Sequence, residues 1–217
     1  MRHSCARVAV HAILASLVLL AAAPLAAHAV VIFSDFGPGD SFDHNIGWTI
    51  GLSGFNFPSA MPFSVSGGSY NLGSIALAVS WVQGPNQLQV KLADDAGGAP
   101  GSILEDFAFV DAMGKFGTAV PLLEANSLAH PLLQDGHTYW LEAGVPTSDT
   151  WAAWNWNTVG VVGGSQMSDA SPWKWDGSSS TGAFRISTDP VPEPSAGLLL
   201  LAGLGALGAL AASRRNR

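Results

Sequence analysis

Five tryptophans fall within 25 residues of the sequence, with asparagine, lysine and aspartate side chains between them: Trp151, Trp154, Trp156, Trp173 and Trp175. Along an extended strand Trp154 and Trp156 would share one face, as would Trp173 and Trp175. Aromatic rings beside amides and carboxylates are typical of sugar-binding surfaces, because the rings stack on C–H faces and the polar groups bond hydroxyls. The same residues could instead fill the core of a domain without disulfides, and we favour that interpretation.

The sequence does not indicate a serine or cysteine hydrolase. A serine hydrolase needs a serine on a strained turn, a histidine base and an orienting carboxylate. Segments 51–54 and 163–166 both lack the Gly-x-Ser-x-Gly spacing. The chain has one cysteine, Cys5, and it lies in the predicted leader segment. The body of the chain offers three histidines as possible bases: His44, His130 and His137.

A glycoside hydrolase is the remaining enzymatic alternative, because two carboxyl groups suffice for that chemistry. The glutamates of the body are Glu105, Glu124 and Glu142. Glu142 follows Trp140 by two positions, which places both on one strand face, where a sugar cleft would place an acid. The spacing between carboxyl groups does not follow from the sequence, and we expect no enzymatic activity.

Metal ligands are sparse. The sequence has no His-x-His, no His-Glu-x-x-His and no cysteine pair, which argues against zinc. Calcium needs only oxygen ligands from loops, and aspartates occur in two suitable places. These are Asp35, Asp40 and Asp43 in one glycine-rich segment, and Asp94 and Asp95 in a predicted hairpin. Neither run matches the twelve-residue calcium loop, so we expect solvated turn carboxylates and no cofactor, with calcium as the alternative.

The elements that must position these residues are strands. Leu88, Val90 and Leu92 alternate with polar residues, and residues 75–81 and 138–143 also show a period of two. Turn residues separate these runs, and no stretch of the body shows a helical stripe. Residues 30–190 are therefore predicted to form one all-β domain, an antiparallel β-sandwich of the jelly-roll type. This domain has 4 Lys and Arg against 15 Asp and Glu, a net charge of −11, which argues against nucleic acid as a partner.

Both ends of the chain are predicted to be targeting segments. Residues 1–29 have basic residues, an apolar stretch and then Ala27-His28-Ala29, which is the pattern of a signal peptide that signal peptidase removes. Near the other end, residues 195–212 are apolar or small. Eighteen helical residues span about 27 Å, which suffices for a transmembrane helix across the inner membrane. The basic cluster behind it would stay cytoplasmic and consists of Arg214, Arg215 and Arg217.

Residues 191–217 resemble the PEP-CTERM sorting signal of exopolysaccharide-producing Gram-negative bacteria. The resemblance rests on Pro192-Glu193-Pro194, the apolar span and the arginine-rich tail. It implies recognition by exosortase, a membrane cysteine protease-transpeptidase, and removal of the helix near Pro192-Glu193-Pro194. Glu193 would then be a recognition element of a substrate.

The body resembles the choice-of-anchor β-sandwich domains of PEP-CTERM proteins. The resemblance rests on the Asp94–Gly101 turn and on the Trp173-Lys174-Trp175 run near the end of the body. That resemblance implies a secreted sandwich without an established activity. We therefore expect a non-catalytic protein of the cell envelope or extracellular matrix, which lies at the cell surface among exopolysaccharide. The alternatives are a carbohydrate-binding module that uses the five tryptophans and a glycoside hydrolase that uses Glu142.

Overall fold

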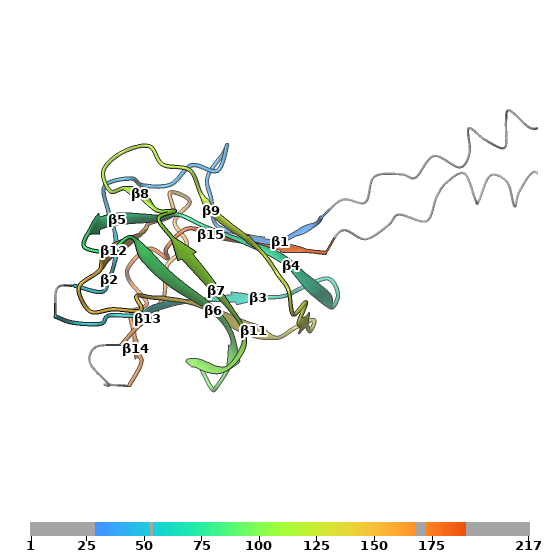
Figure 1. Cartoon of the computed structure of the whole chain (residues 1–217). Coiled ribbons are helices and arrows are strands. Elements are labelled where there is room, and N and C mark those ends of the chain that lie inside the picture. The colour runs from blue at the N-terminus through green and yellow to red at the C-terminus, as the bar shows by residue number, and fades with distance from the viewer. Residues whose placement is uncertain (1–28, 53, 168–171, 190–217) are drawn as a thin grey trace, which may run out of the picture. The chain divides into compact units, whose positions relative to one another are not determined.

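Strands make up all the regular secondary structure in the computed structural model, which describes residues 29–52, 54–167 and 172–189 (Figure 1). No residue in these ranges is helical. The prediction of an all-β domain with antiparallel sheets is therefore confirmed for the described part, whereas the jelly-roll assignment stays a prediction. The signal peptide and the C-terminal helix fall outside the described residues. Within those residues, no helix is long and apolar enough to span a membrane.

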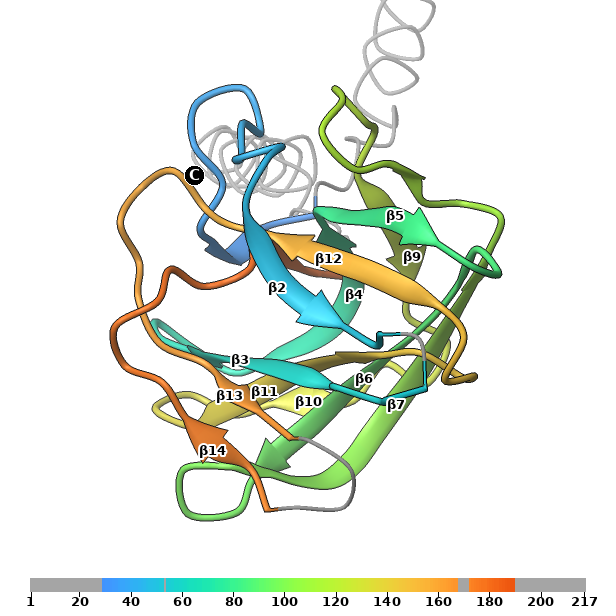
Figure 2. The same cartoon turned by 90° about the vertical axis from the view of Figure 1, so that its left-hand side faces the viewer.

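One layer is a six-stranded antiparallel sheet in the order β14-β13-β3-β11-β6-β7 (Figure 2). Its strands are β3 (Ser59–Ser64), β6 (Gln87–Asp95), β7 (Pro100–Val110), β11 (Thr138–Gly144), β13 (Ser165–Gln166) and β14 (Lys174–Trp175). The long β6–β7 hairpin forms one edge and the short β14 forms the other.

The facing layer consists of two smaller sheets. A five-stranded sheet has the order β1-β15-β4-β10, with β9 also paired to β4. Its strands are β1 (Val31–Ser34), β4 (Tyr70–Leu77), β9 (Leu123–Asn126), β10 (Leu132–Leu133) and β15 (Phe184–Thr188). A four-stranded sheet has the order β2-β12-β5-β8. Its strands are β2 (Gly47–Ile50), β5 (Val79–Gln83), β8 (Gly114–Lys115) and β12 (Trp151–Asn155), and β8 pairs with β5 in parallel.

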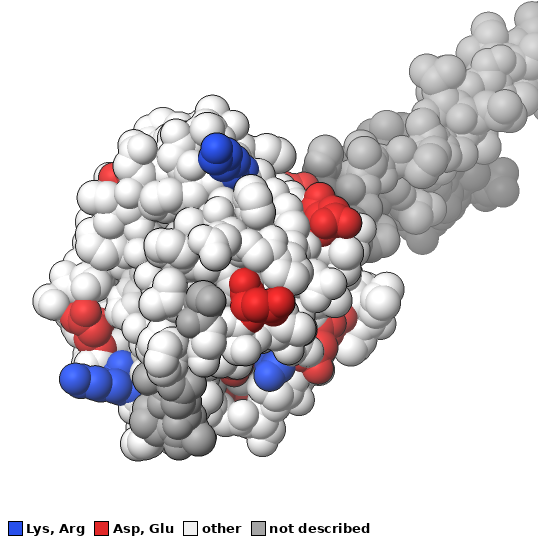
Figure 3. All heavy atoms as spheres, turned by 60° about the vertical axis from the view of Figure 1, so that its left-hand side comes forward, with Lys and Arg blue, Asp and Glu red and all other residues white. Residues whose placement is uncertain are grey.

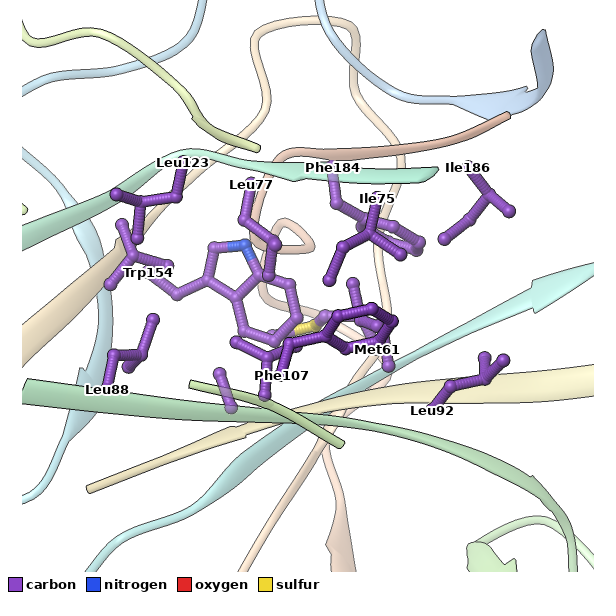
Figure 4. Close-up of a cluster of buried hydrophobic side chains, with 14 of the residues drawn as sticks. Met61, Ile75, Leu77, Leu88, Leu92, Phe107, Leu123, Trp154, Phe184 and Ile186 are labelled. Atoms are coloured by element: carbon purple, nitrogen blue, oxygen red, sulfur yellow. The ribbon is translucent and has the colours of Figure 1, made fainter. Parts of the chain in front are cut away.

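The hydrophobic core lies between these two layers (Figure 4). Leu88, Val90 and Leu92 are at most 2% exposed, so the alternation in β6 does place its apolar side chains inside. Residues of β11 alternate in the same way, with Leu141 in the main core and Trp140 on the opposite face of the sheet. A period of two therefore sets which face of each strand is buried, as predicted.

One predicted strand is divided. Residues 75–81 were expected to form a single strand, but the chain leaves β4 at Leu77 and enters β5 at Val79. The intervening Ala78 donates its backbone N–H to Ala183 and accepts from the N–H of Asn155. At Ala78 the chain passes from the five-stranded sheet to the four-stranded sheet, and these two hydrogen bonds connect the sheets within one layer.

The first and last strands of the body close it at the same edge. β1 pairs antiparallel with β15. Val30, just before β1, accepts a hydrogen bond through its carbonyl from the backbone N–H of Thr188 at 2.8 Å. The N–H of Val30 in turn donates to Thr188 Oγ1 at 3.0 Å. Ala29–Asp189 form one unit with its own core and closed strand pairing. Such a unit has what a domain needs to fold by itself.

Candidate functional site

The five tryptophans lie in different environments. Trp154 is fully buried in the main core and donates its indole N–H to the Ala183 carbonyl oxygen at 3.1 Å. Trp156 packs against the same core and is partly buried. Trp154 therefore fills the core, as in the favoured interpretation, and its side chain is not part of a surface. Trp151 is half-buried on β12, and Trp173 packs on the opposite side of the six-stranded sheet.

Trp175 is the exception among them, with 53% of its surface exposed. It lies on β14 and lines a surface hollow of about 720 Å³. The residues around this hollow come from β2, β13, β14 and the loops beside them. They are Trp48, Phe57, Gln166, Met167, Lys174, Trp175, Asp176, Gly177 and Ser178. An exposed indole in a hollow with amide, amine, carboxylate and hydroxyl groups is the candidate functional site.

Packing holds the indole of Trp175 in place. Trp140 meets it edge to face, with ring centroids 6.2 Å apart and planes at 87°. The Trp140 indole N–H is itself fixed by a 2.7 Å hydrogen bond to Asp95 at the end of β6. A Cβ at Gly163 would lie only 2.6 Å from the Trp175 ring, so glycine is required there for the ring to approach the backbone.

Sequence reasoning missed this support, because Trp140 and Asp95 are 45 residues apart. The period of two placed Trp140 on one face of its strand, but nothing in the sequence indicated that Trp175 lies against that face. The hydrogen bond from Trp140 is the largest influence on Asp95 and, with the N–H groups of Gly97 and Gly98, holds the pKa of its carboxyl below the usual value.

Glu142 lies on the outer face of the six-stranded sheet and does not line the Trp175 hollow. Burial raises the pKa of its carboxyl, and the Lys91 ammonium, 3.6 Å away, only partly offsets this. In register, Lys91 stands opposite Glu142 on one side and Asp106 on the other. The strand that carries Lys91 therefore lies between the strands that carry these two carboxylates.

The aspartates considered for calcium form bonds with the protein itself. Asp35 accepts hydrogen bonds from Thr181 Oγ1 and the backbone N–H of Phe184, and Asp40 pairs with Arg185 at 2.7 Å. Asp43 accepts from the backbone N–H of Asn45. Across the part of the chain that the structure describes, no three acidic, histidine or cysteine side chains come together as a metal site.

Asp35 gives a prediction about pH. It is 1% exposed, and burial raises its pKa to about 6 despite the opposing hydrogen bonds from Thr181 and Phe184. A carboxyl with a raised folded-state pKa stabilises the fold most below its unfolded pKa, near 4, and this stabilisation is lost as the pH rises through about 6. The free energy of unfolding is expected to fall by about 3 kcal/mol between pH 4 and pH 7 because of this one carboxyl.

We expect Asp35→Asn to remove this dependence, because the amide stays neutral and its oxygen can still accept from Phe184. Urea unfolding of both proteins between pH 4 and 7 measures it. The free energy of unfolding of Asp35→Asn should rise relative to the parent protein as the pH increases. Parallel pH profiles would contradict the assignment of a raised pKa to Asp35.

The three histidines do not form a nucleophile–base pair in the described contacts. His130 bonds Asp189 at 2.9 Å and the Leu72 carbonyl at 3.2 Å. His137 is exposed beside a turn, and His44 is packed edge to face on Phe42.

The sequence matches a known family model near its C-terminal end. Residues 190–215 match the PEP-CTERM protein-sorting motif. No curated protein matches the chain. The match confirms the resemblance seen at Pro192-Glu193-Pro194, whereas Ala27, Ala29 and the tail arginines stay predictions outside the described residues. The motif implies export, transient anchoring in the membrane and recognition by exosortase. The chain therefore carries a PEP-CTERM sorting motif at residues 190–215.

Proposed function

We propose that this protein is a non-catalytic component of the cell envelope or extracellular matrix of an exopolysaccharide-producing Gram-negative bacterium. Exosortase would cleave it at Pro192-Glu193-Pro194 and leave the β-sandwich outside the inner membrane. The observation that carries the proposal is the position of the sorting motif. It begins at residue 190, directly after the closing strand β15 and Asp189, so that processing would release the folded body nearly intact.

The contacts of the acidic side chains support a non-catalytic role. Glu142 faces Lys91, and Glu105 accepts hydrogen bonds from Ser127 Oγ and from the backbone N–H groups of Leu128 and Ala129. Burial opposes ionisation of Glu105, but these bonds hold its pKa below the usual value. Carboxylates engaged in this way stabilise loops and sheet faces, which supports a structural role for Glu105 and Glu142.

Fractionation of the host tests the proposed location. We expect the body of the protein in the matrix of the producing strain and in the culture medium of a strain that makes no exopolysaccharide. Recovery of the protein in the inner membrane of both strains would contradict the proposal. An activity on host polysaccharide that Glu142→Gln abolishes would contradict the non-catalytic role and support the glycoside hydrolase alternative.

Carbohydrate binding is the second candidate function, and one observation favours it. Trp175 is 53% exposed in a surface hollow, although an indole ordinarily contributes to stability by being buried. Exposed aromatic side chains held in fixed positions are typical of binding surfaces.

A further inference from the structure

The hollow beside Trp175 has the size and chemistry of a ligand site. Its volume of about 720 Å³ lies within the range of pockets that hold small molecules, roughly 300–1,000 Å³. Trp48 is 9% exposed and forms an apolar wall, whereas Trp175 presents its ring to solvent. Residues of β13 and β14 line the hollow, and β14 is an edge strand of the six-stranded sheet (Figure 2). Among the described residues, no further strand pairs with β14.

The ring of Trp175 is preorganised. Trp140 contacts it edge to face, and Asp95 in turn holds Trp140. Gly163 and Gly177 let the backbone approach the ring, since an added Cβ at either residue would lie within 3 Å of it. A ring fixed in this way loses little conformational entropy when a flat apolar face stacks on it.

Polar groups around the ring are also held in place. Gln166 donates through its Nε2 to the Thr49 carbonyl at 2.8 Å and to Ser59 Oγ at 3.0 Å, which orients its amide. Asp176 accepts from the backbone N–H and hydroxyl of Ser178, at 2.8 and 2.7 Å, and from the hydroxyl of Ser179. Together with the amine of Lys174, these groups offer donors and acceptors to the hydroxyls of a ligand.

The charges favour an uncharged ligand. Lys174 and Asp176 are adjacent to Trp175 in sequence and offset one another. The body of the protein carries a net charge of −11, which repels polyanions. On the face shown in Figure 3, charged side chains are scattered over a mostly uncharged surface. Among the described residues on that face, Figure 3 shows no cluster of Lys and Arg side chains of the kind that binds uronates or phosphates.

We propose that the hollow beside Trp175 binds a neutral glycan, with the C–H face of one pyranose ring stacked on the indole. Hydroxyl groups of the same and the neighbouring sugars hydrogen-bond with Gln166, Lys174 and Ser178. This inference rests on the second candidate function, carbohydrate binding, and does not depend on exosortase processing. It assigns that function to Trp175 alone among the five tryptophans.

The test uses residues 30–190, labelled with ¹⁵N, and neutral oligosaccharides of three to six glucose, mannose or galactose units. The chain has eight tryptophans, so eight indole N–H signals report on ligand contact separately. We expect at least one oligosaccharide to bind saturably and to shift the Trp175 signal most. Trp175→Ala should weaken this binding about tenfold or more, whereas Trp151→Phe, on the other layer, should not. Oligouronates serve as the charged comparison.

The possible results distinguish failure of the proposed Trp175 site from failure of carbohydrate binding as a function. Binding of neutral glycans that is unchanged in Trp175→Ala would overturn the site while carbohydrate binding stands. Binding of oligouronates alone, weakened by Lys174→Ala, would overturn the neutral class. The absence of saturable binding by every glycan tested, with the fold confirmed by the dispersed indole signals, would overturn both the site and carbohydrate binding.

Discussion

Trp154→Ala is expected to lower the free energy of unfolding by about 3–5 kcal/mol, which is the range measured for large aromatic residues removed from protein cores. Trp154 is fully buried, and its ring lies between side chains from both layers (Figure 4). It contacts Phe184 edge to face at 5.9 Å. Alanine would leave a cavity in the middle of the core and would remove one of the two hydrogen bonds that the Ala183 carbonyl accepts, the other coming from the N–H of Ala78. Urea unfolding followed by circular dichroism measures the loss.

Two other variants show whether the position of the indole causes this loss. Trp175→Ala removes an exposed indole and should change the free energy of unfolding by no more than about 1 kcal/mol. Gly182→Ala should destabilise strongly with Trp154 intact, since the added Cβ would lie 2.3 Å from the Trp154 ring. Equal losses in Trp154→Ala and Trp175→Ala would contradict the described core.

Replacement of Pro192, Glu193 and Pro194 by alanine is expected to abolish processing. The sorting motif covers residues 190–215, and exosortase recognises the substrate through it. Without the Pro-Glu-Pro element the predicted helix at 195–212 would remain, and the full chain should accumulate in the inner membrane. Immunoblots of membrane and matrix fractions measure the change, which we expect to be complete.

Glu124→Gln is the matched control for this replacement. Glu124 is an exposed carboxylate outside the motif that pairs with Arg185 at 3.2 Å. Its variant should be processed and released like the parent chain. Normal release of the triple alanine variant would contradict recognition at Pro192-Glu193-Pro194.

The strands could be predicted from the sequence because burial on one face imposes a period of two. Leu88, Val90 and Leu92 follow that rule and are buried. The break at Ala78 could not be predicted, because it depends on backbone bonds to Ala183 and Asn155, which come from distant parts of the chain. Local alternation thus defines strands, whereas the pairing of distant segments decides where they change sheets.

The candidate site was only partly predictable for the same reason. Alternation showed that Trp154 and Trp156 share a face but not that this face points inward. Trp175 lies on a strand of two residues, too short for periodicity to indicate its exposure. The raised pKa of Asp35 depends on burial beside Thr181 and Phe184, which are nearly 150 residues away.

Intact-mass analysis tests the central claim, that this is an exported sandwich released by exosortase. The protein would be purified from the host and from a strain of it that lacks exosortase. We expect the host form to begin at Val30 and to lack the apolar span at 195–212. The strain without exosortase should yield a chain that extends to Arg217. A chain that ends at Arg217 in both strains would contradict the account.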